Sequence, residues 1–207
     1  AGQIESGLAR RVLVVAGENG RPLLEHTLAT LRADPPTRKG LKPYFANLTI
    51  GSAAVAAVLC AEEDCPVPPV GRLEYGVAGT DGRYARLCEG DSAAGGGLMM
   101  QTDSEALLEA GIGLAAATWE RFRAADPLGE PFGHTITHQV GRTHQRRLHE
   151  ALGLEPERDY ATYPFLGNVG SVACPVTLSL AREAGVLAPG ERVALLGIGS
   201  GLSSVML

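Results

Sequence analysis

Residues 192–207 have the sequence RVALLGIGSGLSSVML, and this stretch gives the clearest indication of the fold. Two apolar runs, 192–196 and 202–207, flank the glycine-rich segment 197–201, a pattern that predicts strand, turn and strand. Such a turn presents backbone N–H groups at the rim of a sheet. A dinucleotide-binding fingerprint is the weaker interpretation, because no helix N-terminus follows these glycines to hold a pyrophosphate.

Extended and helical patterns alternate upstream of this stretch, which predicts an α/β protein. Further strands are expected over 12–16, 53–60, 73–78, 84–88 and 135–138, the first of them covered on both faces. Helices are expected over 23–31, 103–125, 140–152 and 172–184. The small side chains of 90–97 predict a mobile loop.

Composition limits the class of protein. Of the 207 residues, 45% are hydrophobic and 20% are charged, which supports a folded core rather than disorder. The net charge of −5 gives no basic surface for nucleic acid or an anionic membrane. No secretory signal, transmembrane run or CxxC spacing is present, so we expect a reduced, cytoplasmic protein.

Both ends of the chain suggest a piece of a longer protein. The first residues resemble the last turn of a helix, closed by Gly7 at its C-terminal end. The last residues, 203–207, are an apolar strand-like run without a polar tail. We therefore expect that something precedes the chain and that a few residues follow it.

Three polar features in the last third of the chain share one possible chemistry. His138 ends a predicted strand, Asn168 lies in a glycine loop before a helix, and Ser200 stands within the glycine turn. A neutral imidazole, an amide and exposed backbone N–H groups can together polarise a carbonyl, such as that of a thioester. Plain hydrogen-bonding roles are the alternative interpretation of the same residues.

The histidines raise a zinc site as a rival. His134 and His138 are four residues apart but lie in an extended segment, and no HExxH arrangement or nearby cysteine is present. We therefore expect no metal site, and we expect His144 and His149 on the surface of the helix 140–152. The apolar stripe of the helix 103–125 is expected to lie in the core.

The order of motifs resembles the ketoacyl synthase III branch of the thiolase-superfamily condensing enzymes. The resemblance is carried by His138-Gln139, LGL at 152–154, Tyr163 followed by GNVGS at 167–171, Pro175 in a helix, and LLGIGSG at 195–201. Residues 45–52, 88–90, 100–108 and 118–119 further resemble OleA-type members, which join two fatty acyl-CoA molecules head to head. The resemblance covers nearly the whole chain.

This resemblance implies the layered αβαβα fold of thiolases, with the chain supplying mainly the second half. Residues 1–60 would end the N-terminal half, and residues 61–207 would form the C-terminal half. His138 and Asn168 match the family's catalytic pair, which binds the thioester carbonyl of the incoming acyl-CoA and stabilises its enolate. The backbone amide of Ser200 matches half of an oxyanion hole. Two departures are Ser200 in place of glycine and Gly141 where many synthases have asparagine.

The resemblance also implies a nucleophilic cysteine at a helix N-terminus upstream of this chain. Cys60, Cys65, Cys88 and Cys174 do not match it, and a structural role is expected for each. The implied reaction is a non-decarboxylative Claisen condensation to a β-keto acyl product, for long-chain olefin, hydrocarbon or β-lactone biosynthesis. In OleA-type enzymes the base is a glutamate from across the dimer interface, and no residue here can be assigned to it. No metal or redox cofactor is needed.

The implied partners are long-chain acyl-CoA substrates, the N-terminal portion of the same enzyme, and a second subunit in a homodimer or heterodimer. Arg142, Arg146 and Arg147 are expected to form a solvated basic face, with contact to CoA phosphates as the alternative. Two other functions stay open. One is β-ketoacyl-ACP synthase III-type condensation, and the other is a non-catalytic partner subunit of a condensing enzyme.

Overall fold

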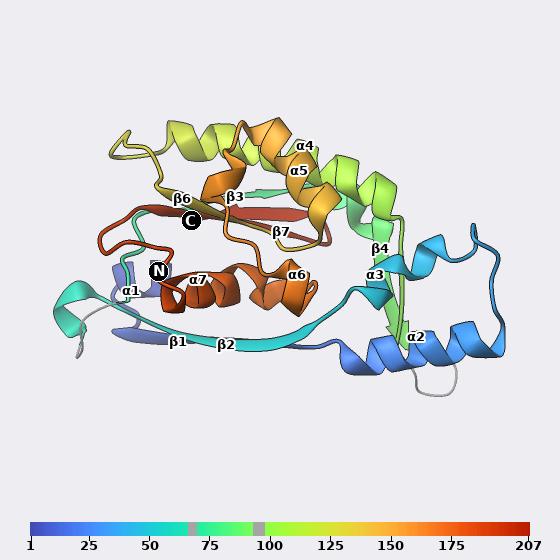
Figure 1. Ribbon diagram of the computed structural model, residues 1–207. Coiled ribbons are helices and arrows are strands. Elements are labelled where there is room, and N and C mark those ends of the chain that lie inside the picture. Colours follow the sequence, from blue (N-terminus) through green and yellow to red (C-terminus); the bar gives the residue numbers. More distant parts are fainter. Residues whose placement is uncertain (66–69, 93–97) are drawn as a thin grey trace.

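The chain is arranged in alternating helical and sheet layers (Figure 1). The computed structural model describes residues 1–65, 70–92 and 98–207. Helices α4 (Ser104–Ala124) and α5 (Arg142–Leu152) cover one face of a four-stranded sheet, and α6 (Tyr163–Leu166) and α7 (Ala173–Glu183) cover the other. A two-stranded ribbon, β1 (Arg11–Asn19) and β2 (Ser52–Cys60), lies beyond α7.

The four-stranded sheet is built around the C-terminal stretch of the sequence. Its order is β3 (Val77–Thr80), β8 (Ser203–Met206), β7 (Val193–Gly199) and β6 (His134–Thr137). Strands β6 and β7 are parallel, whereas β8 pairs antiparallel with both β7 and β3. The strand-turn-strand prediction is confirmed, but β7 extends through Gly199, so the turn is confined to residues 200–202.

The main core lies between this sheet and α4. Trp119 and Phe122 of α4 pack with Leu148, Leu196 and Met206, all of them buried. The Trp119 ring also donates a hydrogen bond from Nε1 to the Leu152 carbonyl, at 3.1 Å, and so ties α4 to the end of α5. The expectation that the apolar stripe of this helix lies in the core is confirmed.

The ends of two helices follow from their sequences. The Asp103 side chain accepts a hydrogen bond from the Ala106 N–H at 3.1 Å and caps α4, which satisfies one of the free donors of the first turn. At the C-terminal end of α5, Gly153 has a φ of +65°, a conformation that glycine adopts without the strain that a Cβ would add. Both boundaries agree with the predicted ones.

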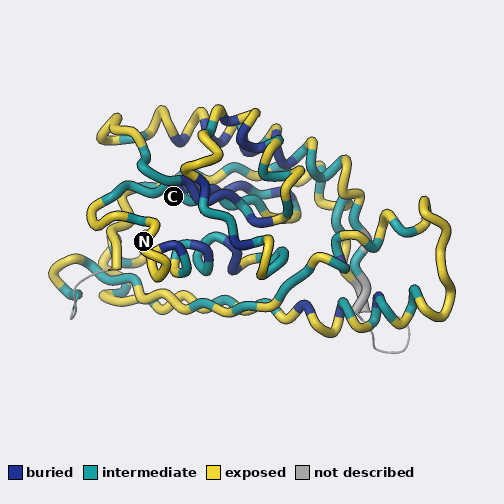
Figure 2. Tube along the Cα trace, in the orientation of Figure 1, coloured by how far each residue is buried: buried dark blue, intermediate teal, exposed yellow. Residues whose placement is uncertain are grey.

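The ribbon of β1 and β2 has one covered and one uncovered face. Ala16, Ala53 and Val55 pack against a small cluster that includes Val169 and Val172. On the opposite face Leu13, Val15 and Val58 are 63%, 66% and 65% exposed. Figure 2 shows exposed residues along much of this ribbon. The prediction that 12–16 is covered on both faces is therefore wrong for this chain, because no described element packs on that side.

Other predicted elements were shifted or replaced. The strand expected over 73–78 begins only at Val77, and 84–88 belongs mostly to a 3-10 helix, Gly82–Leu87, rather than to a strand. The reason is local: the Asp81 side chain accepts a hydrogen bond from the Arg83 N–H at 3.1 Å and initiates the turn. Of the loop expected over 90–97, residues 90–92 end β4, and 93–97 lie outside the described residues.

The remaining elements are short or peripheral. The helices are α1 (Gly2–Glu5), α2 (Arg21–Ala33) and α3 (Phe45–Leu48), and the strands are β4 (Cys88–Ser92) and β5 (Leu98–Thr102), which pair with each other. Further 3-10 turns cover Lys42–Tyr44, Glu62–Asp64, Pro156–Arg158 and Gly170–Val172. Within the described ranges, none of the helices combines the length and the apolar character needed to cross a bilayer.

Candidate active site

His138 stands at one edge of the four-stranded sheet. Strand β6 ends at Thr137, which is paired with Leu196 of β7, and His138 follows at once. Its imidazole is half-buried and meets the ring of His144 edge to face, with ring centroids 6.0 Å apart and an interplanar angle of 78°. The prediction that His138 ends a strand is therefore correct to within one residue.

Both imidazoles are held in the neutral form. Burial, with the neighbouring His144 as the lesser cause, lowers the pKa of His138 to about 4, and burial lowers the pKa of His144 to about 4. A neutral ring at pH 7 has one N–H to donate and one lone pair to accept. His138 can therefore donate a hydrogen bond to a carbonyl oxygen without carrying a charge into the site.

Asn168 is fixed through its backbone. Its N–H donates to the Thr49 carbonyl at 2.9 Å, and its carbonyl accepts from the Gly51 N–H at 2.7 Å, so the loop before β2 holds it on both sides. Its side-chain Oδ1 accepts a hydrogen bond from the Gly170 N–H at 3.0 Å. Because Oδ1 is occupied by the chain's own backbone, the amide is oriented with Nδ2 as the donor for another group.

Two glycines allow the loop that carries Asn168 to lie close to the loop before β2. Gly167, immediately before Asn168, has a φ of +71° and a ψ of −163°, and a Cβ there would lie 2.6 Å from the Thr49 carbonyl oxygen. A Cβ on Gly51 would overlap the Leu166 carbonyl. Side chains at these two positions would force the two loops apart, which explains why glycine occupies both.

Glu18 of β1 supports the same loop from the ribbon. Its Oε1 accepts hydrogen bonds from the Ser171 N–H at 3.1 Å and from the Ser171 hydroxyl at 2.7 Å. The two residues are 153 positions apart in the sequence. The loop that carries Asn168 is thereby connected to β1 and to the loop before β2.

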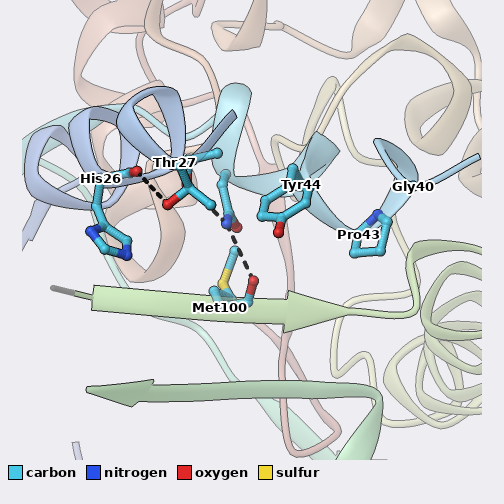
Figure 3. Close-up of a pocket in the computed structure, with 8 residues that line it drawn as sticks. His26, Thr27, Gly40, Pro43, Tyr44 and Met100 are labelled. Atoms are coloured by element: carbon cyan, nitrogen blue, oxygen red, sulfur yellow. Dashed lines mark hydrogen bonds between the residues drawn. The ribbon is translucent and has the colours of Figure 1, made fainter. Parts of the chain in front are cut away.

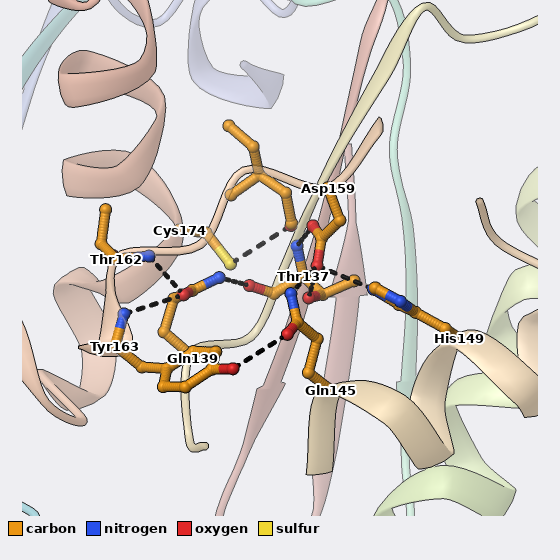
Figure 4. A network of polar contacts seen from close by, with 9 residues as sticks. Thr137, Gln139, Gln145, His149, Asp159, Thr162, Tyr163 and Cys174 are labelled. Carbon is orange, nitrogen blue, oxygen red and sulfur yellow. Dashed lines mark hydrogen bonds and ion pairs between the residues drawn. The ribbon is translucent and has the colours of Figure 1, made fainter. Parts of the chain in front are cut away.

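Gln139 connects the segment of His138 with the segment that leads to Asn168 (Figure 4). Its side chain is 1% exposed, donates from Nε2 to the Thr137 carbonyl at 2.7 Å, and accepts at Oε1 from the N–H groups of Thr162 and Tyr163, at 2.8 and 3.2 Å. Thr162 precedes α6, and α6 runs toward Asn168. The two candidate residues are thus joined through one buried amide.

Asp159 anchors the end of β6 in the same network. Its carboxylate accepts from the Thr137 N–H and hydroxyl at 2.9 and 2.6 Å, from Gln145 Nε2 at 2.8 Å and from His149 Nε2 at 2.8 Å (Figure 4). The Asp159 side chain is fully buried. Every donor directed at this carboxylate comes from β6 or α5, so the carboxylate fixes these two elements to each other.

Ser200 lies at the turn beyond β7 and is exposed. Because β6 and β7 run parallel, their carboxyl ends reach the same edge of the sheet, and Ser200 shares that edge with His138. In the described part of the chain no hydrogen bond joins His138, Asn168 and Ser200 to one another. Gln139 links the segment of His138 to the segment that leads to Asn168, whereas Ser200 is related to His138 only through the pairing of β6 with β7.

The surface placement expected for His144 and His149 is wrong. His149 is 5% exposed and bonded to Asp159, and His144 is half-buried beside His138. Helical spacing alone could not show this, because the partners lie on other segments. The network residues Gln145, His149 and Asp159 were therefore missed, whereas the pairing of Gln139 with His138 in one motif was a usable signal.

Other candidate groups take structural roles. Burial, together with the Asp159 carboxylate, raises the pKa of the Cys174 thiol to about 12, which leaves it without nucleophilic thiolate at neutral pH. On α5, Arg146 pairs with Glu150 at 2.9 Å and Arg147 with Glu109 at 2.8 Å, as a solvated charged face would.

Among the residues that the structure describes, no group of three or more His, Cys, Asp or Glu side chains could hold a metal ion. His134, which raised the zinc alternative, instead bonds through Nδ1 to Glu191 Oε1 at 2.5 Å.

A cavity of about 220 Å³ lies elsewhere, between α2, α3 and β5 (Figure 3). The buried Asn47 donates from Nδ2 to Thr27 Oγ1 and to the Met100 carbonyl, each at 3.2 Å, and its Oδ1 has no partner in the described part of the chain. His26 and Tyr44 complete much of the lining. The described residues that line the cavity include neither a carboxylate nor a thiol, so the segment around His138 and Asn168 is the candidate for catalysis.

The chain is similar to known proteins in sequence and in structure. The family model described as 3-oxoacyl-[acyl-carrier-protein (ACP)] synthase III C terminal matches residues 130–207. An acyl-CoA:acyl-CoA alkyltransferase of Shewanella oneidensis is 36% identical over all of this chain and 61% of its own length. The corresponding enzyme of Xanthomonas campestris is 34% identical over all of the chain and 59% of its own length.

Solved structures of the same kinds of protein also resemble this chain. A crystal structure of Xanthomonas campestris OleA with bound lauric acid and lauroyl-CoA superposes with a TM-score of 0.87 at 32% identity, covering 99% of this chain and 59% of that one. A 3-oxoacyl-(acyl carrier protein) synthase III of Xanthomonas oryzae gives 0.86 at 33% identity over the same shares. The chain spans about three fifths of the length of these relatives.

The layered fold and the likeness to these relatives indicate the class: the chain is similar to the OleA- and synthase III-like condensing enzymes of the thiolase superfamily, and the predicted α/β fold is confirmed. Within that class it is a relative of the OleA alkyltransferases and the synthase III enzymes, and it corresponds to the C-terminal part of their fold.

Proposed function

We propose that this chain supplies the acyl-CoA activating half of an enzyme that joins two fatty acyl-CoA molecules head to head in a non-decarboxylative Claisen condensation. In this proposal His138 and Asn168 hold the thioester carbonyl of the second acyl-CoA, and the backbone N–H of Ser200 contributes to the oxyanion hole of the acyl-enzyme. The two curated alkyltransferases at 36% and 34% identity support this substrate class over others.

The observation that carries the proposal is the state of the two donors. Asn168 has its Oδ1 occupied by the Gly170 N–H, which leaves Nδ2 as a donor, and burial keeps His138 neutral. Two uncharged donors on tethered segments stabilise negative charge that develops on an oxygen, and they do not add a charge to the resting site. That is the requirement for turning a thioester carbonyl into an enolate.

The reaction then has two steps. A cysteine thiolate from the portion of the enzyme upstream of this chain attacks the first acyl-CoA, and CoA thiolate leaves. A base removes the α-proton of the second acyl-CoA, the resulting enolate carbon attacks the acyl-cysteine carbonyl, and the cysteine thiolate leaves. The product is a β-ketoacyl-CoA. In this chain the described residues contribute the donors that hold the enolate oxygen in the second step.

The uncovered face of the ribbon supports the part of this proposal in which a further portion of protein packs against the chain. Leu13, Val15 and Val58 form an apolar face on β1 and β2 that stays exposed in this chain. About two fifths of the relatives' own length lies outside the part that this chain covers. We assign this face to contact with that additional portion, in keeping with a division of the fold near residue 60, and dimer formation remains part of the same proposal.

The decisive experiment uses the complete protein with its upstream portion. It would be incubated with lauroyl-CoA, and two quantities would be measured by mass spectrometry: acyl groups bound to the cysteine and β-keto product. We expect His138→Ala and Asn168→Ala to lower condensation by about 100-fold or more while the cysteine still becomes acylated. Undiminished condensation by His138→Ala would make the catalytic proposal wrong.

The same assay distinguishes the alternatives. Condensation that requires a malonyl thioester on acyl carrier protein and ignores a second acyl-CoA would identify a synthase III-type enzyme, in line with the 26% identical synthase III of Streptomyces coelicolor. A complete protein that neither acylates nor condenses would identify a non-catalytic partner subunit.

A further inference from the structure

Gln139 occupies an unusual position between the two proposed catalytic residues. It follows His138 directly, yet its side chain turns into the interior and is 1% exposed. Its Oε1 accepts from two successive N–H groups, those of Thr162 and Tyr163, which belong to the start of α6. These N–H groups stand at the helix start, where the backbone donors have no partner within the helix.

The other end of the Gln139 amide is equally fixed. Its Nε2 donates to the Thr137 carbonyl at 2.7 Å, and Thr137 is held by the Asp159 carboxylate through both its N–H and its hydroxyl. The amide therefore rests on the anchored end of β6. It is not an independent loop contact.

From these contacts we infer that Gln139 is a positioning residue that sets the place of Asn168 relative to His138. This inference rests on the proposed function and deepens it, because it names the group that holds the two donors in register. Gln139 touches neither substrate nor reacting atoms in this scheme. It acts through α6 (Tyr163–Leu166), which leads from the clamped N–H groups to Gly167 and Asn168.

The effect on catalysis follows from the sensitivity of oriented donors to small displacements. A shift of about 1 Å in a group that holds a reacting atom can cost about 100-fold in rate. Without the Gln139 amide, α6 would keep its bond between Thr162 and Thr177 but would lose two N–H bonds to the β6 segment. Condensation should suffer, whereas acylation of the upstream cysteine does not need the two donors.

The test compares two volume-matched substitutions in the complete protein. Gln139→Met removes the amide and keeps the bulk of the side chain. The control, Thr177→Val, removes the buried hydroxyl that bonds to Thr162 at 2.6 Å but leaves the Gln139 amide in place. Acylation and condensation with lauroyl-CoA would be measured for both, together with a crystal structure of Gln139→Met.

We expect Gln139→Met to lower condensation by about 100-fold at nearly unchanged acylation, with Asn168 displaced by about 1 Å relative to His138. Thr177→Val should leave the ratio of the two rates unchanged. Equal loss of both rates, unchanged condensation, or an unmoved Asn168 would overturn the inference. If Gln139→Met does not fold, Gln139→Leu, which also removes the amide, takes its place under the same criteria.

The crystal structure separates this inference from the proposed function. If the wild-type enzyme fails to condense lauroyl-CoA, the proposed function fails, but the displacement of Asn168 in Gln139→Met still decides whether Gln139 positions it.

Discussion

Replacing Gly167 by alanine tests whether the backbone before Asn168 positions its side chain for catalysis. Gly167 has a φ of +71° and a ψ of −163°, a region that is essentially restricted to glycine. The new Cβ would lie 2.6 Å from the Thr49 carbonyl oxygen, where an ordinary contact is at least 3.4 Å. The loop therefore has to move by roughly 0.8 Å or to change its backbone angles.

The magnitudes follow from these two effects. The backbone strain costs about 1–3 kcal/mol of the free energy of unfolding. The displacement acts on Asn168, which is the next residue. A shift of this size should lower the rate of condensation by tens of times, and by at most about 100-fold. Acylation of the upstream cysteine should be nearly unchanged, because it does not depend on Asn168 in the proposed scheme.

Gly153→Ala provides the matched control. Gly153 also has a positive φ, +65°, but in the described part of the chain an added Cβ would meet no atom within 4 Å apart from its immediate neighbours in the chain. This variant should therefore lose about 1–2 kcal/mol from backbone strain without any displacement near the site. Urea unfolding would measure both free energies, and lauroyl-CoA turnover would measure condensation. Equal condensation rates for the two variants would refute the argument that Gly167 positions Asn168.

Three further predictions concern stability. Asp159→Ala should lower the free energy of unfolding by about 3–5 kcal/mol in urea titrations, because buried donors that now bond to this carboxylate lose their acceptor. The folded-state pKa values of His138 and His144, both about 4, lie below the unfolded value of about 6.5, so unfolding takes up protons on acidification. The free energy of unfolding should therefore fall between pH 7 and pH 5, by about 2 kcal/mol per histidine. His144→Leu should make this fall smaller, and a fall as large as that of the wild type would contradict the argument. Asp103→Ala should cost about 1 kcal/mol by removing the cap of α4, measurable as a lower thermal midpoint.

The sequence was sufficient for elements whose signals are local. The apolar spacing of the helix over 103–125, its Asp103 cap and the glycine at 153 all act within a few residues, and the structure confirms them. The strand, turn and strand of the last sixteen residues were likewise predicted from signals between neighbouring residues. The strand expected over 84–88 failed because Asp81, just before it, offers its side chain to the backbone and favours a 3-10 turn.

The surroundings of the site could not be predicted in the same way. His149 has the spacing of a surface helix residue, but Asp159 folds back over it and buries it. Glu18 binds the loop next to Asn168 from the opposite end of the chain. Each of these contacts joins segments that helical or strand periodicity treats separately.

The sequence by itself determined the α/β class and placed His138, Asn168 and Ser200 in ordered motifs, because turns, caps and apolar periods depend on neighbouring residues. Only the tertiary structure decided that His138 is neutral, that Asn168 presents Nδ2, and that Gln139 joins their two segments. The physical reason is that burial and hydrogen-bond orientation depend on which distant backbone groups come within about 3 Å. Those distances are set by the pairing of β6 with β7 and by the packing of α6 and α7 beneath them.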